Sequence, residues 1–188
     1  MSAEPLVLYW RRVDVEGFER AELRIGTDRI DVTATVLCAG MGGFRLDHRW
    51  TLSPSWTALR IEVERWNRDG LRKLLLERDG DGWAVDGTRR PDLDGAEEPD
   101  LSVTPLCNTF PIRRLPLADD SVLTLDTAYI DGAAMTVERS CQRYVRRGAR
   151  SVRYVDLGAA KGFEADLLVD ELGLVLVYQH LFERIPES

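Results

Sequence analysis

The sequence is poor in the residues that build metal sites and catalytic centres. It has two histidines and three cysteines among 188 residues, and Cys38, Cys107 and Cys141 are too far apart for a metal knuckle or a disulfide framework. No G-x-S-x-G nucleophile motif occurs, and the glycine-rich AGMGGF lacks the lysine of a phosphate-binding loop. We therefore expect no metal site and no cofactor, and we expect the three thiols to be free.

The sequence also lacks an excess of basic residues and any long apolar run. Its 25 basic and 32 acidic residues give a net charge of -7, which disfavours nucleic acid as a partner. The start, MSAEPLVLYWRRV, is unlike an export signal, and no segment is long and apolar enough to span a membrane. We expect a cytoplasmic protein that forms one domain over residues 1–188, and the sequence does not indicate an oligomeric state.

Apolar and polar residues instead alternate with a period of two over most of the chain. The pattern is clear in residues 30–38 and 44–53, continues through 59–63, and passes a turn at 67–70. The Asp-Gly pairs of residues 79–82 predict a hairpin. Similar strands follow residue 121, so we expect about ten to thirteen strands in antiparallel order.

The predicted fold is all-β, a strongly curved antiparallel β-roll or incomplete barrel with one short helical or irregular insertion around residues 100–115. A twisted sheet of this size curls or closes, and its apolar inner face would be large enough for a ligand. The insertion belongs to the segment 92–115, which breaks the alternation. Pro105 favours a short helix through LCNTF, which Pro111 should end. Arg113 and Arg114 would then be extended, with only one of them facing a pocket.

The amino-acid sequence of this segment resembles a family signature. The run DLSVTPLCNTFPIRRL is similar to the DLxxTPxxNTxPIRRL signature of the bacterial "putative glycolipid-binding" family, formerly a domain of unknown function. RWTLSPSWTALRIEVE, QRYVRRG and the ending VDELGLVLVYQHLFERI resemble further elements of that family. Two departures are Cys107, where a threonine is usual, and Gln179-His180, where Pro-Gly is usual. The resemblance implies an antiparallel β-roll with a concave inner surface and a role in binding lipids or glycolipids.

Several residues are candidates for ligand contacts. His48 and Trp50 share one face of a strand with apolar residues, and a core role is favoured over ligand binding for both. Asn108 and Thr109 could select a polar head group by hydrogen bonds, together with Arg113 or Arg114.

Arg139 and Arg143 share parity with apolar positions of their strand, so we expect one or both to point inward. Asp126 or another inward carboxylate would neutralise them, or they would bind an anionic ligand.

The sequence favours a non-catalytic binding protein for a small amphiphile such as a lipid or glycolipid. One alternative is an enzyme acting on a small hydrophobic substrate through His48, with Asp47, Arg139 or Tyr144. The alternation places Asp47 and His48 on opposite faces, which weakens that pair. Another alternative is an interaction or regulatory module that needs no ligand. Whether the interior is filled or hollow distinguishes these possibilities.

Overall fold

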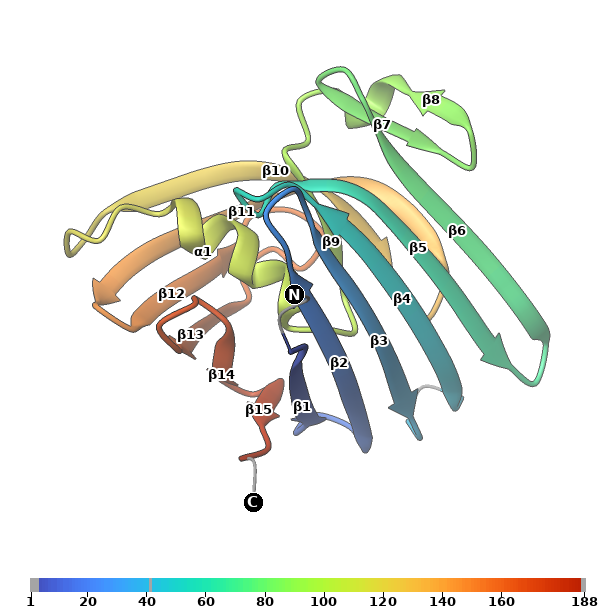
Figure 1. Cartoon of the computed structure of the whole chain (residues 1–188), viewed down its shortest axis with the longest axis horizontal. Helices are drawn as coiled ribbons and strands as arrows, with labels where there is room; N and C mark the ends of the chain where they lie inside the picture. Colours follow the sequence, from blue (N-terminus) through green and yellow to red (C-terminus); the bar gives the residue numbers. More distant parts are fainter. Residues whose placement is uncertain (1–3, 41, 187–188) are drawn as a thin grey trace.

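A computed structural model describes residues 4–40 and 42–186. Within these residues fifteen strands form one sheet in the order β8-β7-β6-β5-β4-β3-β2-β1-β15-β14-β13-β12-β11-β10-β9. The sheet is strongly curved and open, since β8 and β9 are its two separate edges (Figure 1). The predicted all-β, curved antiparallel architecture is therefore confirmed. The strands outnumber the ten to thirteen expected, and several of them are only three or four residues long.

The first wing of the sheet is a series of antiparallel hairpins. Its strands are β1 (Leu6–Arg12), β2 (Gly17–Ile25), β3 (Ile30–Cys38), β4 (Phe44–Leu52), β5 (Ala58–Asn67), β6 (Gly70–Asp79), β7 (Gly82–Val85) and β8 (Thr88–Arg90). Asn67 pairs with Gly70 and Asp79 pairs with Gly82, so both turns lie where the sequence places them. Gly80 adopts φ +64°, the left-handed conformation that such a hairpin turn requires.

The second wing contains the C-terminal half of the chain. Its strands are β9 (Glu98–Leu101), β10 (Val122–Asp131), β11 (Thr136–Gly148), β12 (Ser151–Asp156), β13 (Glu164–Val169), β14 (Val175–Tyr178) and β15 (Phe182–Arg184). β15 pairs with β1 and joins the two wings, whereas β9 pairs with β10 in parallel. This parallel pair departs from the expected antiparallel order, because a long insertion separates the two strands.

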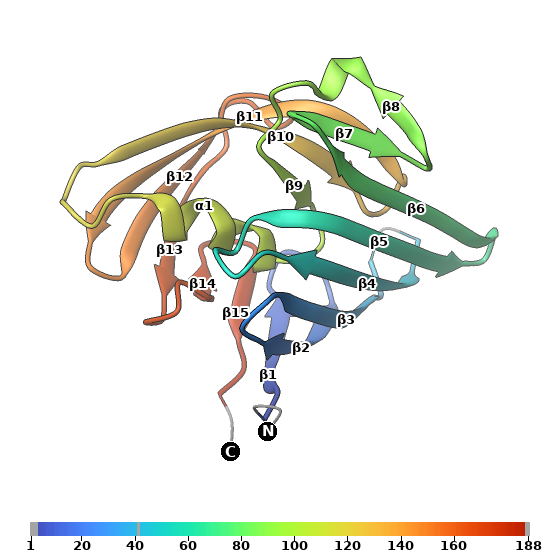
Figure 2. The ribbon, with the colours of Figure 1, turned by 45° about the horizontal axis from the view of Figure 1, so that its top comes forward.

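The insertion contains two 3₁₀ turns, η1 (Pro91–Leu93) and η2 (Leu106–Asn108), and the helix α1 (Thr109–Arg114). η1 packs beside β7 and β11, whereas α1 lies in the hollow between the two wings (Figures 1 and 2). Leu106, Phe110 and Ile112 are buried in the core, and the Phe110 ring packs edge-on against Trp50 with centroids 5.3 Å apart. Much of the concave face is therefore filled by protein side chains.

The expectation that Pro111 would end the helix is wrong. Pro111 is the third residue of α1, and a proline is tolerated in a first turn because its missing N–H donor is not needed there. The helix ends one residue before Pro116, where Leu115 is extended. Arg113 and Arg114 are thus neighbours on a helix, about 100° apart around its axis, and not on opposite sides of an extended chain.

The inward orientation expected for Arg139 and Arg143 is also wrong. Both are exposed, and β11 instead buries its even positions, Ser140, Gln142, Tyr144 and Arg146. The sequence pattern misleads because this inner face is largely polar. Arg146, for example, donates to the backbone oxygens of Ile112, Leu115 and Pro116 at 3.1–3.3 Å. Hydrogen bonds within the protein thus take the place of apolar packing at these positions.

Candidate functional site

His48 and Trp50 belong to a buried hydrogen-bonded chain between β4, β2 and the insertion. The indole of Trp50 donates to His48 Nδ1 at 2.8 Å. An indole N–H can only donate, so Nδ1 accepts, and the other ring nitrogen donates to Glu19 Oε1 at 3.1 Å. Thr104 Oγ1 donates to the same oxygen at 2.8 Å. His48 is 0% exposed with both ring nitrogens occupied, which agrees with the core role favoured from the sequence.

A cavity of about 220 Å³ lies between the insertion and the second wing, and we call it the acidic aromatic cavity. Two carboxylates and a set of aromatic rings line it, together with small polar residues. The lining residues are Asp100, Leu101, Ser102, Thr104, Asn108, Tyr129, Tyr154, Asp156, Ala160, Phe163, Tyr178, Leu181 and Phe182. Tyr154, Phe163, Tyr178 and Phe182 form a continuous cluster with centroids 5.8–6.3 Å apart.

Asp100 supplies the first carboxylate, at the C-terminal end of β9. Burial raises its pKa to about 6, because a carboxylate that has lost water is disfavoured in its charged form. The negative charge of Asp156 raises it further, while hydrogen bonding from Cys107 and Gln142 acts in the opposite direction. Gln142 Nε2 donates to Oδ2, and the side chain keeps partial exposure toward the cavity.

Asp156 supplies the second carboxylate, at the end of β12. Its Oδ1 accepts from the backbone N–H groups of Gly158 and Ala160 at 2.8 and 3.0 Å. Its Oδ2 accepts from the Tyr154 hydroxyl at 3.1 Å. These bonds hold the loop of residues 157–163, which places Ala160 and Phe163 at the cavity wall.

The structure brings two of the predicted site residues together. Asn108 Nδ2 donates to the Tyr144 hydroxyl at 3.0 Å, and that hydroxyl donates to Gln142 Oε1 at 3.0 Å. Asn108 lines the acidic aromatic cavity, whereas Tyr144 lies behind the wall and is 1% exposed. Burial raises the pKa of Tyr144 well above its ordinary value. Thr109 is fully buried, and its hydroxyl has no hydrogen-bond partner within the described residues.

The predicted arginines lie elsewhere. Arg113 stacks on Trp56, 4.5 Å from the ring centroid, and donates to the carbonyl of Leu172 at 2.6 Å. Arg114 pairs with Glu97 at 2.8 Å. Both line a polar surface cavity of about 420 Å³ with Arg146.

Arg139 and Arg143 of β11 bond to groups outside the acidic aromatic cavity. Arg139 pairs with Asp126 at 2.5 Å, as expected for a neutralised arginine. Arg143 donates to Thr124 at 3.3 Å.

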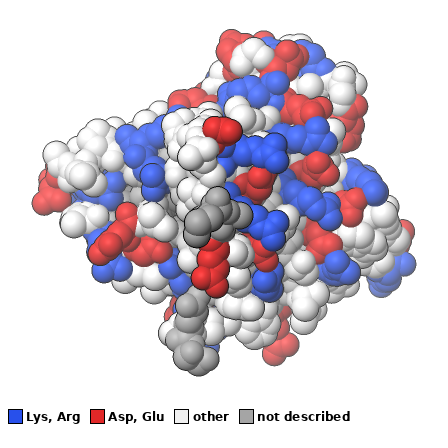
Figure 3. All heavy atoms as spheres, in the orientation of Figure 1, with Lys and Arg blue, Asp and Glu red and all other residues white. Residues whose placement is uncertain are grey.

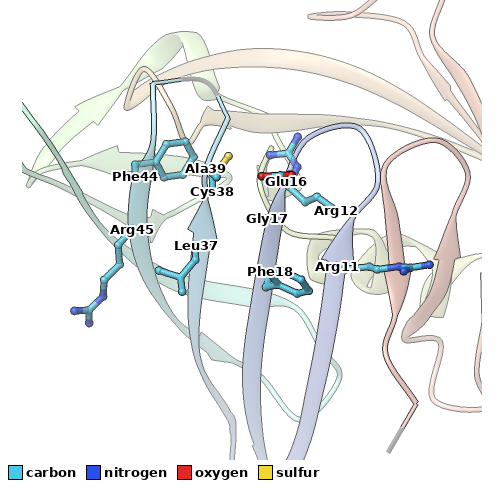
Figure 4. Close-up of a pocket in the computed structure, with 10 residues that line it drawn as sticks. All are labelled: Arg11, Arg12, Glu16, Gly17, Phe18, Leu37, Cys38, Ala39, Phe44 and Arg45. Carbon is cyan, nitrogen blue, oxygen red and sulfur yellow. The ribbon is translucent and has the colours of Figure 1, made fainter.

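A larger apolar cavity of about 550 Å³ lies where β1 and β3 end and β2 and β4 begin (Figure 4). We call it the strand-end cavity. Its lining residues are Arg11, Arg12, Glu16, Gly17, Phe18, Leu37, Cys38, Ala39, Phe44 and Arg45. Phe18 and Leu37 face each other across β2 and β3 and are 57% and 55% exposed. Such exposure of large apolar side chains is typical of a binding surface when they lie together.

The two cavities meet at one contact. Arg12 lines the strand-end cavity, and its guanidinium stacks over Phe182, 5.4 Å from the ring centroid. Phe182 lines the acidic aromatic cavity. Arg12 is held in place by Asp14, which accepts from Nε and Nη2 at 3.0 and 2.6 Å. One stacked pair thus borders both the cavity that holds the two carboxylates and the apolar strand-end cavity.

Sequence reasoning missed the two carboxylates and most of the aromatic cluster. Asp100 opens the run DLSVTPLCNTFPIRRL, so the signature itself could have indicated it. Tyr154 and Asp156 lie at buried, alternate positions of β12, and Tyr178 ends the otherwise apolar β14. No local pattern distinguishes them from core positions.

The protein thus belongs to the class of open, strongly curved β-sheet proteins. Its sheet encloses a partly filled hollow, and cavities lie beside that hollow. The chain belongs to the family described as "Putative glycolipid-binding", whose model matches residues 7–184. The family predicted from the sequence is thereby confirmed. The sequence matches no protein of curated function.

A solved structure supports the fold independently. The crystal structure of a DUF1089 family protein from Pseudomonas aeruginosa matches with a TM-score of 0.76 and 34% sequence identity. The match covers 89% of this chain and 92% of the other. Acidic and basic side chains are interspersed on the face shown in Figure 3. No helix in the described part of the chain is long and apolar enough to cross a membrane.

Proposed function

We propose that this protein binds a small amphiphile, a lipid or a glycolipid, and does not transform it. The observation that carries the proposal is that the Arg12–Phe182 stack borders both an apolar cavity and a second cavity that holds two carboxylates. An amphiphile has the same two-part chemistry. The family description points in the same direction. The cytoplasmic location stays a prediction from the sequence.

The volumes of the two cavities support a division of the ligand between them, with the tail in the larger and the head group in the smaller. The strand-end cavity, about 550 Å³, lies within the range of about 300–1,000 Å³ common for small-molecule sites. The acidic aromatic cavity, about 220 Å³, is below that range and suits a single head group. Burying about ten methylenes contributes roughly 8 kcal/mol before the cost of association. The tail therefore provides most of the affinity.

Binding of dodecyl amphiphiles tests this proposal. Dodecyl glucoside, dodecyltrimethylammonium and dodecyl phosphate, each kept monomeric, are titrated into the protein by calorimetry and by native mass spectrometry. We expect at least one of them to bind with one-to-one stoichiometry and more tightly than its octyl counterpart, because each buried methylene contributes about 0.8 kcal/mol. Failure of all three to bind would overturn the proposal.

Leu37→Asn locates the tail, with Leu59→Asn as its control. Both leucines are exposed on neighbouring parts of the sheet, at 55% and 41%, but only Leu37 lines the strand-end cavity. We expect Leu37→Asn to weaken the bound amphiphile about tenfold, the equivalent of about 1.4 kcal/mol of apolar contact, and Leu59→Asn to leave binding unchanged. Equal affinities for the two variants would place the tail elsewhere.

A further inference from the structure

The acidic aromatic cavity has two carboxylates and no basic side chain among its lining residues. Arg12 stacks on the Phe182 ring, but Asp14 pairs with it. Lys161, in the loop beside the cavity, is exposed. The charges of Asp100 and Asp156 thus have no ion-pair partner within the described part of the chain. Buried carboxylates without such a partner are costly, and a bound cation would remove that cost.

Hydrogen-bonding groups are also left unused in this cavity. Asn108 is 4% exposed, its Nδ2 bonds to Tyr144, and its Oδ1 accepts from no donor among the described residues. Tyr178 is 7% exposed, and its hydroxyl has no partner within the same residues. Asp100 accepts from Gln142 Nε2 at Oδ2 and borders the same space. Carboxylate, amide and phenol oxygens therefore border the space together.

The aromatic rings add a second attraction for positive charge. Tyr154, Phe163, Tyr178 and Phe182 line the cavity as one cluster. The negative faces of aromatic rings attract ammonium groups, most strongly where water is excluded. A phosphate would instead meet two carboxylates and be repelled. A neutral sugar could stack on the rings, but it would leave both carboxylates without a counter-charge.

We propose that the acidic aromatic cavity binds an ammonium group, the cationic head group of the amphiphile. This inference deepens the proposed function by naming the head group, and it depends on Asp100 and on the rings of Tyr154 and Tyr178. Asp156 contributes charge while its oxygens hold the neighbouring loop.

The proton is the natural competitor of such a cation. The titratable groups that act on Asp100 or are acted on by it carry either no charge or a negative charge: Asp156, Tyr129, Tyr144, Tyr154, Tyr178 and Cys107. Burial raises the pKa of Asp100 to about 6. At pH 5 about nine-tenths of such a carboxyl is protonated, so ammonium affinity should fall about tenfold from its value at pH 7.5.

The same three dodecyl amphiphiles test the head group, because they share one tail. At pH 7.5 we expect dodecyltrimethylammonium to bind at least tenfold more tightly than dodecyl glucoside, with dodecyl phosphate weakest. Tetramethylammonium, which has no tail, should bind weakly and lose affinity between pH 7.5 and pH 5. Equal or tighter binding of the glucoside or the phosphate, or no effect of pH on the ammonium, would overturn the inference.

Asp100→Asn removes the charge and keeps the shape, and Asp166→Asn is its control. Asp166 is an exposed acid of the same wing, paired with Arg153, so both variants change the net charge equally. We expect only Asp100→Asn to abolish the ammonium preference. Tyr178→Phe provides a second variant. It should also weaken ammonium binding, and its effect should be severalfold smaller than that of Asp100→Asn. An unchanged preference in a folded Asp100→Asn protein would also contradict the inference.

The outcomes separate this inference from the proposed function. If the glucoside binds through its tail and the ammonium has no advantage, the amphiphile proposal stands and the head-group assignment fails. If tetramethylammonium binds through Asp100 and none of the dodecyl compounds gains from its tail, the cavity assignment stands and the amphiphile proposal fails.

Discussion

Replacing Glu98 with Gln should make the protein more stable near neutral pH. Glu98 lies on β9 and is 1% exposed. Its Oε2 accepts from the backbone N–H of Ala58 at 3.0 Å, and its Oε1 has no hydrogen-bond partner within the described residues. Arg114 approaches Oε1 only to 3.6 Å and makes its shorter contact, 2.8 Å, with Glu97. A buried carboxylate in this position lacks full compensation for its lost water.

The pKa of Glu98 gives the size and the sign of the effect. Burial raises it from an ordinary 4.5 to about 7, against the opposing influence of the Ala58 N–H, Arg114 and Arg78. Between these values the folded protein keeps a proton that the unfolded chain has lost, so stability falls as pH rises. At ~1.4 kcal/mol per pH unit, the loss across this window is about 3 kcal/mol. It is absent below pH 4.5 and complete above pH 7.

Urea unfolding of the wild type and Glu98→Gln at several pH values from about 4.5 to 8 measures this term. Asp100 titrates in part of the same window in both proteins, so its contribution cancels in the difference. We expect the free energy of unfolding of the variant, relative to the wild type, to rise by about 3 kcal/mol across the window. Glu138→Gln, which removes an exposed carboxylate of β11 that does not act on Glu98, should follow the wild-type profile. A difference that stays constant with pH, or that falls as pH rises, would refute the reasoning.

Two further substitutions test how the insertion and the cavity loop are held. Thr104→Val removes the donor to Glu19 Oε1 and the acceptor for the Leu106 N–H, and should lower the free energy of unfolding by about 1–3 kcal/mol. The control Thr33→Val, at an exposed position, should change it little. Equal effects of the two substitutions would argue against a stabilising role of the buried hydrogen bonds. Gly158→Ala places a Cβ against Ser140 Oγ and 2.6 Å from the Cys141 nitrogen, and should lower the free energy of unfolding in urea by about 1–3 kcal/mol. Gly148→Ala, where the new Cβ lies 4.0 Å from Ser151, is the control. An unchanged stability of Gly158→Ala would show that the loop shifts freely.

Local pattern predicted the sheet well wherever one face is apolar and the other polar. In β3 the buried and outward positions alternate as the sequence does, because side chains in a strand point to opposite faces in turn. The hairpins of the first wing followed for the same reason, since each connects neighbours in sequence. In β11 the rule failed, because Gln142 and Arg146 face inward and bond to groups far away in sequence.

The candidate site was harder to predict from the sequence because it is assembled from segments far apart in the chain. Asn108 and Tyr144 were both singled out and do touch, but Asp100 and Asp156 meet only through the fold, on strands β9 and β12, which are not neighbours in the sheet. Their importance arises from burial and mutual repulsion, which raise the pKa of Asp100. Neither property exists in a local sequence pattern.

The insertion serves both as a structural plug and as a cavity wall, since its residues face the two wings differently. Phe110 packs on Trp50, and Thr104 bonds to Glu19, so this part closes the core under the first wing. Asp100, Ser102 and Asn108 border the cavity under the second wing. Thr104 belongs to both sets. Because fixing a polar constellation requires a rigid support, the plug is what keeps Asp100 largely shielded from water beside Asp156. A hollow roll without the plug would let water reach both carboxylates.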